Sequence, residues 1–124
     1  MIKAFVPALA LLIATSALAQ TQPAAYVEMQ GTWTVDLRLA LTDEPYTQPM
    51  VLNIAADKTV TGTFYNSEIL VGKAGMAQGR ACVAFRSTDG SGEYHSAACL
   101  QDGKMIGTTW AEGRAFVLPW TAER

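Results

Sequence analysis

Hydrophobic and polar residues alternate cleanly between residues 32 and 41. One parity carries only large apolar side chains, namely Trp33, Val35, Leu37, Leu39 and Leu41. The positions between them are polar or small. Because successive side chains of a strand point to opposite faces, this pattern predicts a strand from Thr32 to about Leu41 with one apolar face. We expect the remainder of the chain to cover that face.

Seven further short segments have strand character and are separated by turn signals. They cover about residues 50–54, 59–65, 69–77, 80–88, 93–100, 105–110 and 114–123. The strongest hairpin signal is Asp89-Gly90-Ser91-Gly92. We expect no helix after residue 19. Short consecutive strands with a turn roughly every 8–12 residues predict an all-β, eight-stranded antiparallel up-and-down barrel, because closure removes exposed edges. An open sandwich is the alternative.

The first 19 residues have the form of a secretory signal peptide. Lys3 supplies a positive start, an apolar run follows, and Ala17-Leu18-Ala19 has the small-x-small form of a cleavage site. The apolar run is shorter than the roughly 20 residues of a membrane span. We therefore expect a periplasmic or secreted protein that has no membrane span after cleavage. The predicted organisation is a signal peptide at 1–19, an N-terminal lead-in at 20–30 and a single barrel domain at 31–124.

The charge balance bears on the class of partner. The formal net charge of the whole chain is −2, and removal of Lys3 with the signal peptide makes it −3. The sequence contains no basic cluster, whereas contacts to phosphates need one. We therefore expect no nucleic-acid partner.

The two cysteines and the hairpin signal together predict a disulfide. Exported compartments are oxidising, so a pair of cysteines there favours a disulfide over two free thiols, which remain the alternative. If the turn is centred between residues 90 and 91, Cys82 lies opposite Cys99 on the neighbouring strand. The same register places Arg86 opposite His95 on the outer face. Because His95 is the only histidine, the sequence predicts no metal site.

Motifs of common enzymes are missing from the sequence. It contains no nucleophile elbow, glycine-rich phosphate loop or carboxylate pair. Tyr94 is flanked by Glu93 and His95, but adjacent strand residues point to opposite faces, so the three cannot converge. Asp36 and Arg38 share one face and are expected to form a solvated charge pair. We expect a protein that is not an enzyme and has no cofactor.

Several short motifs, in order along the chain, resemble those of calycin-type barrels, especially avidins and more loosely lipocalins. Both families open with Gly-x-Trp, and the avidin pattern continues Thr-x-Asp-Leu. The matching stretches here are Gly31-Thr32-Trp33-Thr34-Val35-Asp36-Leu37, Thr61-Gly62-Thr63-Phe64, Thr108-Thr109-Trp110 and Trp120-Thr121-Ala122-Glu123-Arg124. They spread over nearly the whole chain after the signal peptide. The resemblance implies a calycin-like barrel with a ligand site at its mouth.

The polar groups that bind biotin in avidins are mostly replaced. Their amide, loop serine, strand-three tyrosine and following threonine correspond here to Val35, Leu39, Phe64 and Asn66, while Trp110 alone matches a biotin-contacting aromatic. A site that loses several hydrogen-bond partners loses most of its affinity for a buried polar ligand. We therefore do not expect high-affinity biotin binding.

The final arginine is expected at the closed end of the barrel. In an eight-stranded up-and-down barrel the last strand runs antiparallel to the first, so Arg124 lies at the end where Trp33 begins. An arginine across this tryptophan resembles the closed end of lipocalins, and the cation–π contact would be worth about 1 kcal/mol. A frayed terminal arginine is the alternative.

We expect the barrel to bind rather than to catalyse, and the first hypothesis is a small apolar ligand at the mouth. The candidate lining residues are Phe64, Asn66, Trp110 and Tyr46. Small barrels are commonly filled by their own side chains, so a packed interior is the alternative.

The second hypothesis is a protein-interaction module, such as a periplasmic inhibitor of lysozyme or a protease, or a homo-oligomer subunit. Ser91-Gly92-Glu93-Tyr94 resembles the Ser-Gly-x-x-Tyr stretch of one lysozyme-inhibitor family, with the tyrosine one residue early. Outward-facing Val51, Tyr65 and Val117 would offer a surface for sheet-on-sheet association.

Overall fold

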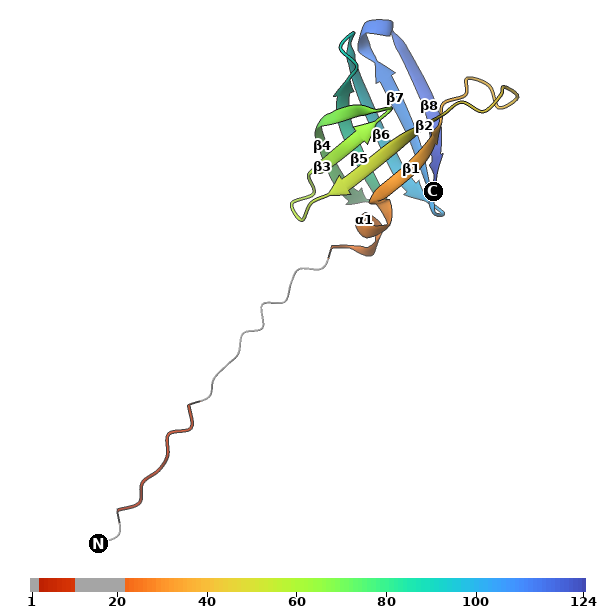
Figure 1. The fold of residues 1–124 in the computed structure, drawn as a ribbon. Helices are drawn as coiled ribbons and strands as arrows, with labels where there is room; N and C mark the ends of the chain where they lie inside the picture. The colour runs from red at the N-terminus through yellow and green to blue at the C-terminus, as the bar shows by residue number, and fades with distance from the viewer. Residues whose placement is uncertain (1–2, 11–21) are drawn as a thin grey trace.

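The computed structural model describes residues 3–10 and 22–124 (Figure 1). Residues 3–10 are exposed and form neither helix nor strand. Much of the predicted signal peptide, including its cleavage site at Ala17-Leu18-Ala19, lies outside the described residues. The barrel begins after them.

Eight antiparallel strands form one closed barrel in sequence order (Figure 1). The strands are β1 Gly31–Asp36, β2 Thr47–Ile54, β3 Val60–Phe64, β4 Ser67–Ala77, β5 Arg80–Thr88, β6 Glu93–Gln101, β7 Lys104–Ala111 and β8 Phe116–Glu123. Each strand pairs with the next, and β8 pairs with β1 through residues such as Val35 and Ala122. The predicted all-β up-and-down barrel is confirmed, and its architecture is consistent with a calycin-like fold.

The first strand is shorter than its alternating pattern predicts. β1 ends at Asp36, whose carboxylate accepts hydrogen bonds from the backbone N–H and the guanidinium of Arg38, with a shortest distance of 2.6 Å. The predicted Asp36–Arg38 pair is thus present, and it turns the chain out of the barrel wall. Leu39 and Leu41 are 87% and 86% exposed in a projecting loop (Figure 1). Their predicted burial is wrong, because local hydrogen bonding replaces the strand ladder there.

The β5–β6 hairpin has the predicted register. Cys82 lies opposite Cys99, Arg86 lies opposite His95, and a disulfide joins the two cysteines. The predicted disulfide is confirmed. It closes a loop with a sequence separation of 17, for which the chain-entropy account gives about 3 kcal/mol of stabilisation.

The strand β7 faces the opposite way from the orientation that the expected cavity-lining role of Trp110 requires. Met105 and Thr109 are buried, whereas Ile106 and Trp110 are exposed on the outer face. The reason is the large ring of Trp120 on β8, which lies inside the barrel opposite Gly107. A side chain at position 107 would collide with that ring. The face of β7 that contains Gly107 is therefore the one that points into the barrel.

One end of the barrel is closed by a short helix and by the last residue. The helix α1 (Ala24–Met29) lies in the segment expected to contain no helix, and its buried Tyr26 and Met29 pack against the barrel core. Six residues are too few to show a helical periodicity. Figure 1 shows α1 and the C-terminus at the same end.

The predicted contact between Trp33 and Arg124 is present at this end. The guanidinium carbon of Arg124 lies 4.3 Å from the centroid of the Trp33 ring. The guanidinium also donates hydrogen bonds to the carbonyl oxygens of Glu28 and Gln30. The Trp33 indole in turn donates to the carbonyl oxygen of Met29 over 2.9 Å. Arg124 is therefore held in place rather than frayed.

Candidate functional site

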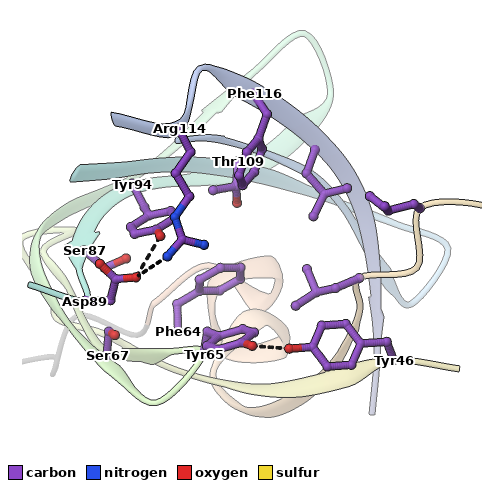
Figure 2. Close-up of a pocket in the computed structure, with 13 residues that line it drawn as sticks. Tyr46, Phe64, Tyr65, Ser67, Ser87, Asp89, Tyr94, Thr109, Arg114 and Phe116 are labelled. Atoms are coloured by element: carbon purple, nitrogen blue, oxygen red, sulfur yellow. Dashed lines mark hydrogen bonds and ion pairs between the residues drawn. The ribbon is translucent and has the colours of Figure 1, made fainter. Parts of the chain in front are cut away.

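The end of the barrel opposite α1 is hollow. A cavity of about 450 Å³ lies between the β1–β2, β3–β4, β5–β6 and β7–β8 connections (Figure 2). It is lined by Leu37, Leu39, Tyr46, Phe64, Tyr65, Ser67, Ser87, Asp89, Tyr94, Thr109, Arg114, Phe116 and Leu118. This volume lies within the range of roughly 300–1,000 Å³ that is typical of small-molecule sites. The barrel is therefore not filled throughout by its own side chains.

The floor of the cavity is aromatic. Phe64 is buried at the end of β3, and its ring centroid lies 5.5 Å from that of Phe85 and 5.4 Å from that of Trp120. Leu37 and Leu118 add apolar wall beside it. Because these rings pack on one another, they separate the filled core from the hollow end.

Two buried hydroxyl groups beside this floor have different surroundings. The Thr109 hydroxyl accepts a hydrogen bond from the Trp120 indole over 2.8 Å and bonds with the Ser96 hydroxyl over 2.8 Å. Ser87, at 2% exposure, also lines the cavity. Ser87 therefore places a hydroxyl group at the wall of the cavity.

Asp89, just beyond β5, organises the polar side of the mouth. One carboxylate oxygen accepts hydrogen bonds from the Ser91 backbone and hydroxyl. The other accepts the Tyr94 hydroxyl over 2.8 Å and lies 3.5 Å from the Arg114 guanidinium. The hydrogen bonds from Ser91, then that from Tyr94, lower the pKa of Asp89 to about 2. Asp89 is therefore ionised at neutral pH.

Arg114 reaches the mouth because of the short connection between β7 and β8. This connection is the 3₁₀ helix η1 (Glu112–Arg114), followed by Ala115 in the left-handed region at φ 53°. Figure 2 shows the Arg114 side chain extending toward Asp89 and the cavity. Partial burial, then the hydrogen bond to Asp89, raises the pKa of Tyr94 beside them.

Two tyrosines meet on another side of the mouth. Tyr46 directly precedes β2, and Tyr65 occupies the two-residue β3–β4 turn with Asn66. Their hydroxyls are hydrogen-bonded to each other, which raises the pKa of Tyr65. The outward orientation predicted for Tyr65 is wrong, because its positive φ of 53° turns the side chain over the mouth.

The structure brings together two of the four predicted ligand-binding residues. Phe64 and Tyr46 line the cavity, and their role in binding stays a prediction. Asn66 is exposed in the β3–β4 turn, and its amide donates to Gln48 over 3.3 Å rather than lining the cavity. Trp110 is 47% exposed on the outer face, so the inward orientation expected for it is wrong.

The polar side of the cavity was missed by sequence reasoning. Ser87 lies near the end of β5 and Asp89 just beyond it. Tyr94 is the second residue of β6, and Arg114 follows β7. Because alternate turns of an up-and-down barrel lie at the same end, the turn positions in the sequence carry this signal. Which side chains point inward at a turn is set by local backbone angles, and periodicity does not report these.

A shallower depression lies on the outer face of β4–β8. Its apolar members include Val71, Trp110 and Val117. The Trp110 ring stacks on His95 with a centroid separation of 5.0 Å, and the His95 ring nitrogen lies 3.5 Å from the Glu112 carboxylate. This surface is the second place where apolar side chains gather.

Comparison with known protein families, curated proteins and solved structures finds no match to this chain. Within residues 3–10 and 22–124, no helix is long and apolar enough to cross a membrane. In the same part of the chain, no group of three or more His, Cys, Asp and Glu residues is placed to hold a metal ion.

Proposed function

We propose that this chain is an exported, non-enzymatic binding protein that holds a small, mainly apolar molecule in the open end of its barrel. The observation that carries the proposal is the cavity of about 450 Å³ above the aromatic floor at Phe64. Pockets of this size with apolar walls and a few polar groups are characteristic of small-molecule sites.

The closed end and the disulfide support this reading. Because α1 and Arg124 cover one end, the barrel has one hollow end for a ligand to enter. The disulfide between Cys82 and Cys99 fits an oxidising, periplasmic or extracellular compartment.

The resemblance to avidins and lipocalins also favours a site at the mouth. It does not favour biotin, because Val35, at the position of the avidin amide, is fully buried in the core and does not line the cavity. A different, more apolar ligand is therefore proposed.

A cavity-filling variant and a matched outer-face variant test the proposal. The probe is N-phenyl-1-naphthylamine, an uncharged apolar dye whose fluorescence rises on binding. Leu118→Trp adds bulk inside the cavity, whereas Val117→Trp adds the same group on the outer face of the same strand. Wild type and Val117→Trp should bind the dye, and Leu118→Trp should bind it much more weakly. Equal binding by both variants, with thermal unfolding showing that both are folded, would contradict a site in the cavity.

A second candidate function is association with a protein partner, of which a second copy of this chain is the simplest. It is favoured by the exposed apolar side chains of Trp110 and Val117 on neighbouring strands. Size-exclusion chromatography with light scattering would give a dimer for wild type and a monomer for Trp110→Glu. A monomeric wild-type protein across the micromolar range would remove this candidate in its homodimeric form.

A further inference from the structure

The cavity is asymmetric in its chemistry. Figure 2 shows Ser87, Asp89, Tyr94 and Arg114 gathered on one side. The floor around Phe64 and the wall formed by the leucines are apolar, and the Tyr46 and Tyr65 hydroxyls at the mouth are bonded to each other. A ligand that matches both sides has an apolar body and one polar end.

The carboxylate of Asp89 is already satisfied. Its two oxygens accept hydrogen bonds from the Ser91 backbone, the Ser91 hydroxyl and the Tyr94 hydroxyl, and one of them also contacts Arg114. Four donors occupy most of the acceptor capacity of a carboxylate. Asp89 is therefore a fixed support for Tyr94 and Arg114 rather than an unpartnered acceptor waiting for a ligand.

Arg114 has more hydrogen-bond donors than its ion pair with Asp89 uses. Its guanidinium presents several N–H groups in a planar fork, and the one ion pair that it forms within the described residues is the 3.5 Å approach to Asp89. Its side chain is 60% exposed at the mouth. The Ser87 hydroxyl lies deeper on the same side. The polar side of the cavity thus offers the guanidinium donors of Arg114 and the Ser87 hydroxyl, whereas the acceptor oxygens of Asp89 are already engaged.

We infer that the ligand is a small amphipathic carboxylic acid, with its carboxylate held by Arg114 and its apolar body against Phe64 and Leu118. The planar guanidinium fork matches a carboxylate in two parallel hydrogen bonds. Ser87 supplies a further donor toward the polar end of the ligand. A cationic ligand is disfavoured, because it would meet Arg114 and find Asp89 already engaged. This inference rests on the proposed function, since it names the ligand class of the same cavity.

The test compares two ligands that differ only in their polar group. Isothermal titration calorimetry at pH 7 measures 2-naphthoate and its uncharged amide, 2-naphthamide, on protein purified from the periplasm without refolding. Hydrogen bonds between Arg114 and a charged carboxylate are stronger than those to a neutral amide. We therefore expect wild type to bind the carboxylate about 10-fold or more tightly than the amide. Arg114→Gln should abolish this preference and leave the affinity for the amide nearly unchanged.

A matched control separates the mouth from overall charge. Arg80→Gln removes the same charge from an exposed residue at the start of β5, at the closed end of the barrel, and should keep the wild-type preference. Ser87→Ala should weaken naphthoate binding more than it weakens binding of the uncharged dye N-phenyl-1-naphthylamine.

Each contrary result has a definite meaning. Equal affinity for naphthoate and naphthamide, or a preference that survives in Arg114→Gln, would overturn the inference while the proposed apolar site stands. Binding of the uncharged dye without binding of naphthoate would do the same. If neither the dye nor either naphthyl ligand binds, the proposed function itself fails.

Discussion

The indole ring of Trp120 lies directly against the backbone of Gly107, its partner across the β7–β8 ladder. A Cβ built at Gly107 would fall 2.6 Å from the Trp120 ring. That ring is also held by its hydrogen bond to Thr109 and by packing on Phe64. The floor of the cavity therefore depends on a position that carries no side chain.

We predict that Gly107→Ala destabilises the protein by about 1–3 kcal/mol, the usual cost of overpacking a well-filled core. The measurement is urea unfolding followed by tryptophan fluorescence. Gly75→Ala in β4 is the control, because a Cβ there meets nothing within 4 Å. A neutral Gly107→Ala variant would mean that the Trp120 ring can move aside, and the floor would then be softer than its contacts indicate.

Arg124 is predicted to stabilise the closed end through its charge as well as its shape. Removing the guanidinium in Arg124→Ala loses the cation–π contact with Trp33, worth about 1 kcal/mol, together with hydrogen bonds to the backbone of α1 and Gln30. Arg124→Lys should restore part of the loss, because an ammonium keeps the charge but not the planar fork. Thermal unfolding measures both, and the Arg80→Ala variant, at an exposed site, should leave the Tm almost unchanged. Equal Tm values for Arg124→Ala and wild type would show the terminus to be frayed.

The disulfide between Cys82 and Cys99 is predicted to contribute about 3 kcal/mol, chiefly by restricting the unfolded chain. The double variant Cys82→Ala/Cys99→Ala should lower the free energy of unfolding by about this amount. Reduction of the wild-type protein should have the same effect. A mass lower by two hydrogens than that of the reduced chain checks that the bond is formed. If the double variant and the oxidised protein are equally stable, the strand ladder alone holds this hairpin.

Asp89 is predicted to make stability depend on pH in the acidic range. Its folded-state pKa of about 2 lies below the ordinary value, so its contribution is fully present above about pH 4. That contribution is lost as the pH falls through about 2. Asp89→Asn should therefore lower the Tm at pH 7, and the difference from wild type should shrink between pH 4 and pH 2. Circular dichroism melts across this range measure it.

The control for this pH dependence is Asp102→Asn, in the exposed β6–β7 turn at the other end of the barrel. A Tm difference for Asp89→Asn that stays constant from pH 7 to pH 2 would mean that the charge of Asp89 does not stabilise the hairpin. The size of the effect at pH 7 reports on the negative charge and on one of the two acceptor oxygens, because the asparagine amide keeps the other.

Most of the barrel wall could be predicted from the sequence because its causes are local. Alternation of side chains between two faces identifies strands, and a turn signal centred between residues 90 and 91 sets the register that pairs Cys82 with Cys99. The meeting of Trp33 and Arg124 follows from the even number of strands, which places the last residue at the end where the first strand begins.

The shape of the hollow end depends on the tertiary structure and could not be predicted from the sequence. The first strand leaves the wall beyond Leu37, where the Arg38 backbone N–H bonds to the Asp36 carboxylate instead of to a neighbouring strand, although the alternating pattern continues to Leu41. Both faces of β7 carry apolar residues, so its orientation depended on which face could accept the ring of Trp120. The cavity is what remains when side chains from all eight strands have been packed, and that volume is a property of the closed barrel rather than of any one segment.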